Sequence, residues 1–210
     1  MSTASRLVES VLDLDSQLRL SSQSAGLLMT PEEFRGVTDV DESFRYELVH
    51  NVCVVHPAPS VNERLPNGTL GHWLRMYGDS HPRDFSLNET VFGQEVRTLH
   101  GICRPDRVIW AGLGRFPEID RDPPTIVIEF VSKTSRDRRR DYEQKREEYA
   151  EIGVAEYWII DRFRRTMTVC RGSEVPMIVR ETQTFTTERL PGFELPLGKL
   201  LAIADRYVDK

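Results

Sequence analysis

Residues 125–137 read TIVIEFVSKTSRD, an apolar and β-branched run with one carboxylate, Glu129, inside it. This composition predicts a buried strand. An isolated ionised carboxylate is costly to bury, so Glu129 needs a cation, a metal ion or hydrogen-bond donors beside it. Two explanations stay open on this stretch alone: an ion pair with one of the arginines that follow, or a functional site.

The segments after this strand indicate the fold class. Residues 136–152 contain no Pro or Gly and are rich in good helix formers, which predicts a helix that ends at Gly153. The sequence AEYWIID, 155–161, predicts a further apolar strand. Strand, helix and strand joined by short links form a βαβ unit with parallel strands. We therefore expect an α/β fold, with antiparallel strands over 166–195 and a closing helix in 196–207.

Further elements precede the unit. CRPDRVIWAG (103–112) predicts a strand, and YELVHNVCVV (46–55) predicts a β-hairpin that turns at His50-Asn51. In MTPEEF, Thr30 is suited to cap a helix that begins at Pro31. Residues 69–77 are predicted to be helical, and the Pro66-Asn67-Gly68 step is expected to limit how far this helix extends upstream.

Length and composition predict one sizeable globular domain. The chain has 210 residues, of which 39% are hydrophobic and 29% are charged. Residues 1–28, an amphipathic stretch followed by SSQSAG, are expected to form an N-terminal helical arm, with the main domain at 29–210. Three cysteines without a CxxC spacing indicate buried, reduced thiols. With no 18-residue apolar stretch and no signal-peptide core, we expect a cytoplasmic protein without a membrane partner.

Charge is distributed unevenly along the chain. The net charge of −5 argues against a generally basic surface, so a nucleic-acid partner would need a local patch. Residues 133–146 hold seven basic and three acidic side chains. Four arginines there are candidates for contacts with a phosphate backbone: Arg136, Arg138, Arg139 and Arg140. The alternative is a solvated helix face with i,i+4 pairs, such as Asp141 with Lys145.

Three residues form a constellation with a chemical use. Asp106 opens one strand in a Pro-Asp step, Glu129 lies in the next strand, and Lys145 lies on the following helix. Two carboxylates suit Mg²⁺, which is often held by one or two carboxylates together with substrate phosphates. Such an ion acidifies a water molecule, and an ammonium group offsets charge that develops on a phosphate. This chemistry is metal-dependent phosphodiester hydrolysis, although the bare spacing is a weak signal.

The sequence resembles a known family in several of these segments. The run RPDRVIW…TIVIEFVSKTSRDRRRDYEQKREEYAEIGVAEYWIID, with FRYELVHNVCVVHPAPS upstream and LPGFEL downstream, is similar to the Uma-two family of restriction endonucleases, within the PD-(D/E)XK nuclease superfamily. The resemblance covers roughly residues 29–203. It implies a restriction-endonuclease-like core: a mixed sheet flanked by helices, with a Mg²⁺ or Mn²⁺ site at one end of the central strands and DNA as the substrate.

The family pattern assigns roles to individual residues. It matches Asp106 and Glu129 as metal ligands, Lys145 as the catalytic amine and Glu47 as an upstream glutamate that supplements the metal site or holds its water. The usual lysine two positions after the strand glutamate is Val131 here. Lys133 competes with Lys145 for that role, and an ion pair with Arg45 is the alternative for Glu47.

Two functions remain open on the sequence. One is a Mg²⁺- or Mn²⁺-dependent DNA endonuclease, and the other is a nuclease-fold protein that binds nucleic acid or a partner protein without cleavage. A homodimer, with the N-terminal arm as a contact, is a further possibility that the resemblance raises.

Overall fold

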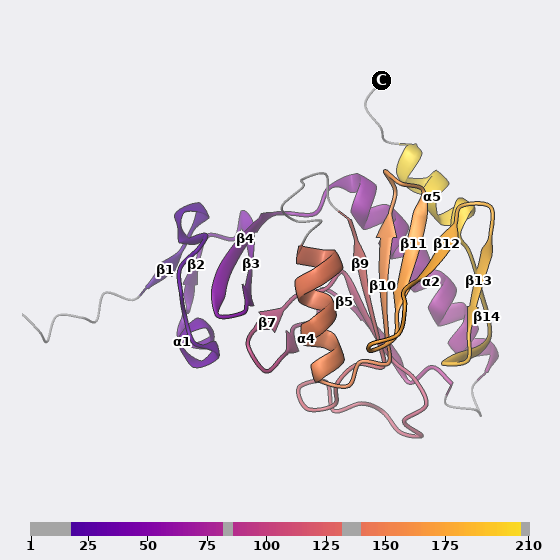
Figure 1. Cartoon of the computed structure of the whole chain (residues 1–210), viewed down its shortest axis with the longest axis horizontal. Coiled ribbons are helices and arrows are strands. Elements are labelled where there is room, and N and C mark those ends of the chain that lie inside the picture. The colour runs from indigo at the N-terminus through magenta and orange to yellow at the C-terminus, as the bar shows by residue number, and fades with distance from the viewer. Residues whose placement is uncertain (1–17, 82–85, 132–139, 207–210) are drawn as a thin grey trace, which may run out of the picture.

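The centre of the molecule is a six-stranded mixed sheet (Figure 1). The computed structural model describes residues 18–81, 86–131 and 140–206. The strand order is β12-β11-β10-β9-β8-β5, in which β9 and β10 are parallel and the other neighbours antiparallel. The strands are β5 (Glu89–Phe92), β8 (Arg107–Trp110), β9 (Ile126–Phe130), β10 (Glu156–Asp161), β11 (Thr166–Cys170) and β12 (Met177–Arg180). The expected parallel pair and mixed sheet are confirmed.

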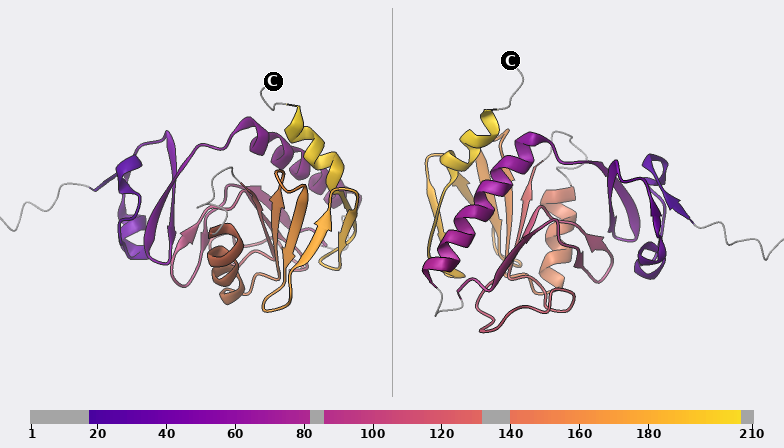
Figure 2. Two further views of the ribbon diagram at one scale, coloured as in Figure 1. Left: turned by 45° about the horizontal axis from the view of Figure 1, so that its top comes forward. Right: turned by 180° about the vertical axis from the view of Figure 1, so that it is seen from behind.

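Helices cover both faces of the sheet (Figure 2). One face packs against α2 (Val61–Ser80) and α5 (Leu197–Asp205), where Leu74 joins a core that includes Trp158. The opposite face packs against α4 (Lys145–Glu151). This two-sided burial explains why β9 and β10 are apolar along nearly their whole length.

The helix α4 carries one site candidate and is short. A π-helical turn, η2 (Arg140–Gln144), leads into it, and the helix stops just before Gly153, whose φ is +83°. Tyr149 on α4 is fully buried against Val127 and Ile159 of the sheet. The predicted helix over 136–152 is thus seen from Arg140 onward, and its earlier residues lie outside the described part of the chain.

A second, smaller sheet lies beside the first (Figure 1). Its order is β4-β3-β7-β6, and its own core contains Tyr46, Leu48 and Phe34. The elements of this part are α1 (Pro31–Gly36), β3 (Phe44–Val49), β4 (Val52–Pro57), β6 (Val96–Arg97) and β7 (Ile102–Cys103). Glu47, one of the residues that the sequence singles out, lies in β3 of this sheet.

Two local predictions in this part are confirmed. The β3–β4 hairpin turns at His50 and Asn51, whose φ angles are +48° and +60°. Thr30 caps α1: its hydroxyl accepts the Glu33 N–H at 3.2 Å, and its own N–H donates to Glu33 Oε2 at 2.7 Å. Both motifs are set by neighbouring residues, which is why the sequence was sufficient.

The start of the described chain forms a two-stranded sheet of its own and packs into the core of the smaller part. β1 (Arg19–Leu20) pairs in parallel with β2 (Asp39–Val40), and a 3-10 turn, η1 (Ser22–Ser24), follows β1. Leu20 is buried in the core of this part. The helix expected in the N-terminal arm falls mainly on residues 1–17, which lie outside the described residues.

The prediction that Pro66-Asn67-Gly68 limits the upstream extent of a helix was wrong. α2 runs without interruption from Val61 to Ser80 with Pro66 inside it. A proline inside a helix costs about 3 kcal/mol. Glu63 offsets part of this cost, since its Oε2 accepts the Ser60 N–H at 2.7 Å and closes the helix start. Burial of Leu70 and Leu74 in the main core stabilises the helix further.

The remaining elements complete the domain. β13 (Thr184–Thr187) and β14 (Leu190–Pro196) form a hairpin that leads into α5. Cys53, Cys103 and Cys170 are free and buried, as predicted. Among the described residues, no helix combines the length and the apolar character needed to cross a membrane.

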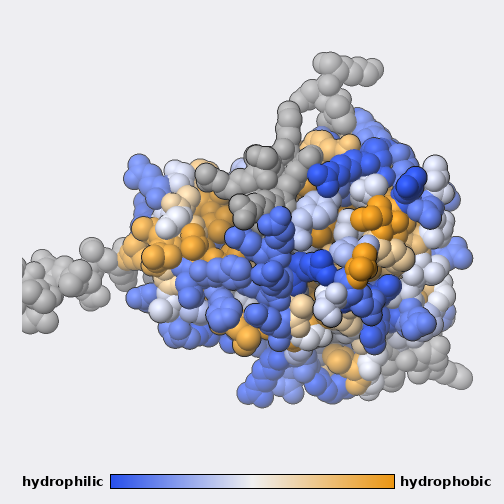
Figure 3. Space-filling view, viewed as in Figure 1, coloured by the Kyte–Doolittle hydropathy of each residue, from blue (hydrophilic) through white to orange (hydrophobic). Residues whose placement is uncertain are grey.

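The surface differs between the two parts of the molecule. Figure 3 shows hydrophobic residues gathered over the N-terminal part, whereas the surface nearer the middle of this face is largely hydrophilic. Leu18, Leu27 and Leu28 in the N-terminal part are exposed. The homodimer, with the N-terminal arm as a contact, stays a prediction.

Candidate active site

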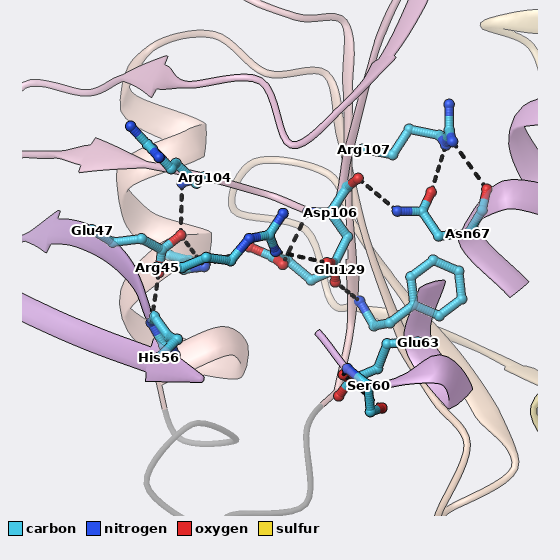
Figure 4. Close-up of polar contacts among 12 residues, drawn as sticks. Arg45, Glu47, His56, Ser60, Glu63, Asn67, Arg104, Asp106, Arg107 and Glu129 are labelled. Atoms are coloured by element: carbon cyan, nitrogen blue, oxygen red, sulfur yellow. Dashed lines mark hydrogen bonds and ion pairs between the residues drawn. The ribbon is translucent and has the colours of Figure 1, made fainter. Parts of the chain in front are cut away.

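Two carboxylates meet where β9 ends and β8 begins. In this antiparallel pair Arg107 stands opposite Ile128, and Asp106 and Glu129 are the next residues along each strand. The Asp106 N–H donates to Glu129 Oε2 at 3.3 Å, and the Phe130 N–H donates to Asp106 Oδ2 at 2.8 Å (Figure 4). Backbone donors therefore hold both carboxylates side by side at this end of the sheet.

Lys145, the first residue of α4, reaches the same point from the helix. Its Nζ donates to Glu129 Oε1 at 2.5 Å and to Glu47 Oε1 at 2.9 Å. All three side chains are nearly excluded from water, with exposures of 3% for Lys145, 3% for Glu47 and 8% for Glu129. The ammonium between the two carboxylates offsets part of the cost of burying each charge. A cation is therefore the partner that allows Glu129 to occupy an apolar strand.

Glu47 lies in the middle of β3 and connects the small sheet to the site. In addition to Lys145, its Oε1 accepts the Arg104 N–H at 2.6 Å, and its Oε2 lies 3.0 Å from His56 Nε2. Arg45, which the sequence offered as a partner for Glu47, forms an ion pair with Asp106, with 3.6 Å between Nη1 and Oδ1. The contacts of Glu47 make it a support for the lysine.

Burial and charge act together on Asp106. Desolvation raises the pKa of this carboxyl well above its usual range, and the neighbouring charge of Glu129 raises it further. The Phe130 N–H, Arg45 and Lys145 oppose this rise in pKa and do not cancel it. A divalent cation beside Asp106 and Glu129 would offset the repulsion between these two neighbouring carboxylates.

The donor set fits a hard cation that brings its own water. Asp106 and Glu129 line one pocket of about 80 Å³ together with Lys145 and Glu47. Within the described ranges, no three His, Cys, Asp or Glu side chains are grouped to hold a metal ion by themselves. Mg²⁺ does not require such a group, because it is commonly held by one or two carboxylates with water and substrate phosphate oxygens completing the shell. The residues present thus fit Mg²⁺ or Mn²⁺ better than a three-ligand zinc site.

A buried arginine fixes the backbone at Asp106. Arg107 Nε donates to Asn67 Oδ1 at 2.7 Å, and Nη1 donates to Thr90 Oγ1 at 3.1 Å. Asn67 Nδ2 in turn donates to the Asp106 carbonyl at 2.8 Å (Figure 4). Desolvation, followed by the charge of Arg75, lowers the pKa of Arg107 to about 10. Through this network α2 determines where Asp106 lies.

The structure brings four of the predicted site residues together: Asp106, Glu129, Lys145 and Glu47. The arginines expected to contact DNA are mostly not described, since 136, 138 and 139 lie outside the described residues and Arg140 is placed only by its backbone. Lys133, the competitor for the amine, also lies outside this part of the chain. The possible pair between Asp141 and Lys145 rests on an Asp141 side chain that is not described.

Several residues of the site were not singled out by sequence reasoning. His56, Asn67 and Arg107 make polar contacts there, but each belongs to a segment whose local pattern indicates secondary structure and nothing more. A weak signal existed for Arg107, because an arginine inside an apolar strand raises the same question as Glu129 does. Its partners are Asn67 on α2, 40 residues away, and Thr90 on β5, 17 residues away, so the pairing could not be read from spacing.

The fold and site define a mixed α/β protein whose acidic pair and lysine sit at one end of the central strands. The family model described as "Uma2: Putative restriction endonuclease" matches residues 31–198, and the chain belongs to this family. A crystal structure titled as a putative nuclease belonging to DUF820 from Anabaena variabilis ATCC 29413 is similar, with a TM-score of 0.69 at 13% identity. The match covers 84% of this chain and 99% of that one. No curated protein matches the chain. Family membership supports a nuclease.

Proposed function

We propose that the protein is a Mg²⁺- or Mn²⁺-dependent DNA endonuclease. The observation that carries this proposal is the placement of the Lys145 amine 2.5 Å from Glu129, with Asp106 directly beside Glu129 across the β8–β9 pair. Two carboxylates and one ammonium in a single small pocket supply the charges that phosphodiester hydrolysis requires. Membership in a family described as restriction endonucleases supports DNA as the substrate.

Each residue has a defined task in this proposal. Asp106 and Glu129 would hold the cation through carboxylate oxygens, and the chemistry supplied by a bound cation would be a more acidic water and neutralised phosphate charge. The Lys145 ammonium orients the water and offsets negative charge on the phosphate oxygens. Glu47 holds the lysine amine in place through Oε1, and His56 and the Arg104 N–H fix Glu47.

The four arginines at 136–140 are the proposed contacts with the DNA backbone. Each phosphate that they neutralise would add about 0.9 to the slope of log affinity against log salt concentration on duplex DNA. Replacing Arg136, Arg138, Arg139 and Arg140 by Gln should therefore flatten the measured salt dependence of binding. An unchanged slope would assign the phosphate contacts to other residues.

One feature favours the second candidate function, binding without cleavage. The Lys145 amine is already engaged by two carboxylates, and the chain as a whole is acidic, with a net charge of −5. A lysine neutralised in this way would contribute to folding and not to catalysis. The two functions differ in whether the site binds a divalent cation and cuts DNA.

The test compares wild type with Glu129→Gln and Lys145→Met on supercoiled, linear and single-stranded DNA in Mg²⁺ or Mn²⁺. Glu194→Gln, an exposed glutamate on β14, is the matched control. Cutting that needs the metal, is lost in both site variants and is retained in the control would support the proposal. Absence of cutting by the wild type, together with absence of Mn²⁺ binding in calorimetry, would refute it and favour the binding function.

A further inference from the structure

A second hollow adjoins the catalytic pocket. It has a volume of about 300 Å³ and shares four lining residues with that pocket: Arg45, Pro59, Glu63 and Asp106. Its other walls come from the first turns of α2, from Arg107 of β8 and from the end of β5, which is the edge strand of the main sheet. A ligand group in this hollow would therefore lie next to whatever occupies the site at Asp106.

An exposed aromatic ring lines the hollow. Phe92, the last residue of β5, stands opposite Arg107 in the β5–β8 pair, and paired residues of neighbouring strands point to the same face of the sheet. Phe92 thus lies on the α2 side of the sheet, opposite the residue that follows Asp106. Phe92 is 64% exposed. Single exposed aromatic residues are common on protein surfaces. This one differs because it lines a hollow that also includes Asp106.

Another part of the wall contains a glycine. Gly68 on α2 lines the hollow, and a Cβ built on it would meet no atom within 4 Å. Arg64 and Arg45 lie at the same hollow and supply positive charge beside the apolar surface. The amide of Asn67 is already committed to Arg107 and to the Asp106 carbonyl, so it offers little for reading the edge of a base. The hollow suits a flat, uncharged ring attached to an anionic backbone.

We infer that this hollow binds an unpaired nucleobase of the DNA strand whose phosphate lies at Asp106 and Glu129, with Phe92 as the stacking surface. The inference rests on the proposed function, because it assumes DNA as the substrate. A base inside a duplex is stacked on both sides and would have to leave the helix to reach the ring. The substrate class is therefore single-stranded or locally unpaired DNA, and stacking without edge recognition gives little sequence preference.

The first experiment measures binding with cleavage suppressed. In the Glu129→Gln background, binding of a single-stranded oligonucleotide containing 2-aminopurine is followed by its fluorescence, for Phe92→Ala and Phe92→Trp. Phe116→Ala is the matched control, since Phe116 is 78% exposed and does not line the hollow. Loss of one stacked base should weaken binding about 5- to 150-fold in Phe92→Ala, while Phe92→Trp and the control keep the affinity. Equal affinity of Phe92→Ala and Phe116→Ala would overturn the inference.

A second variant fills the hollow instead of removing a wall. Gly68→Leu has room for its Cβ and improves helix propensity, so it should fold normally, and thermal melting checks this. Gly68→Leu should reduce cleavage of single-stranded and gapped DNA. Gly36→Leu is the control, because Gly36 in α1 also has open space at its Cβ position, and it should leave cleavage unchanged. A wild-type preference for fully paired over gapped DNA would also refute the inference.

The two proposals fail in different ways. If the wild type neither cuts DNA nor binds Mn²⁺ while Phe92→Ala still loses DNA binding, the nuclease proposal falls and the base-binding hollow stands. If the wild type cuts DNA and the variants of Phe92 and Gly68 cut every substrate as it does, the hollow falls and the nuclease stands.

Discussion

Removing the buried amine gives the sharpest test of how the site is held together. Lys145→Met keeps most of the side-chain volume and deletes the group that bonds to Glu47 at 2.9 Å and to Glu129 at 2.5 Å. The Glu47 and Glu129 carboxylates then lose the ammonium group between them, and both side chains remain buried. Breaking one partner out of a buried ion pair costs about 3–5 kcal/mol, because an uncompensated charge stays behind. For a chain of this length each kcal/mol lowers the melting temperature by about 2–4 °C, so we expect a decrease of about 6–20 °C.

Urea denaturation and thermal melting, both without divalent cation, measure this loss. Lys199→Met is the control, because Lys199 is exposed on α5 and its removal should change stability by less than about 0.5 kcal/mol. The double variant Lys145→Met with Glu47→Gln removes one of the stranded charges and should recover part of the lost stability. A fall of less than 2 °C in Lys145→Met, or no recovery in the double variant, would refute the idea that the amine holds two buried carboxylates together.

Three further outcomes are expected. Gly71→Ala should lower the free energy of unfolding in urea by about 1–3 kcal/mol, because its Cβ would overlap the Arg107 guanidinium. Gly68→Ala on the same helix should raise the free energy of unfolding by up to about 1 kcal/mol. A stabilised Gly71→Ala would contradict the close packing of Arg107 against this helix. Excess Mn²⁺ at about 100 times its dissociation constant should stabilise the wild type by about 2.7 kcal/mol and leave Glu129→Gln unshifted in thermal melting. Hydrogen bonds from Arg115, and next from the Glu118 N–H, lower the pKa of Asp122 to about 2. The stabilising effect of the ionised Asp122 should therefore be full above pH 4 and fade toward pH 2. Asp122→Asn should have a lower melting temperature than the wild type at pH 6 but not at pH 2.

Much of the fold could be predicted because its signals are local. The capping residues of α1, the left-handed turn at His50-Asn51 and the apolar strands around Glu129 depend on neighbours in the sequence. α2 could not be predicted correctly, because its passage through Pro66 depends on core contacts made by residues further along the helix. Helix propensity gives the free-energy cost of a proline inside the helix, but the helix forms because its tertiary packing offsets that cost.

The site divides in the same way. An acidic residue in an apolar strand stands out in any sequence, which is how Glu129 could be found. Asp106 was found through its Pro-Asp step at the start of a strand and through the family resemblance. Arg45 and Asn67 carry no such mark, because an arginine in a half-exposed strand and an asparagine in a helix are ordinary. Both residues contact Asp106, which lies 61 residues after Arg45 and 39 residues after Asn67 in the sequence. Only the folded arrangement of the strands and α2 brings these residues together.

Strand geometry explains why the helix supplies the lysine here. Val127 and Val131 pack in the core beneath α4, so by alternation Glu129 also faces α4. A lysine at 131, where the usual motif has it, would project on that face; with Val131 there, an amine can reach the same face from the helix that covers it. Delivery from a helix requires the helix to be held in register with the strands. Glu148, buried one turn after Lys145, accepts the His50 N–H at 2.9 Å and the Thr98 hydroxyl at 2.5 Å, and so ties α4 to the β3–β4 turn. The strand that carries Glu47 and the helix that carries Lys145 are thereby fixed to each other. This fixed arrangement lets a lysine on α4, and not one on β9, place its amine beside Glu129.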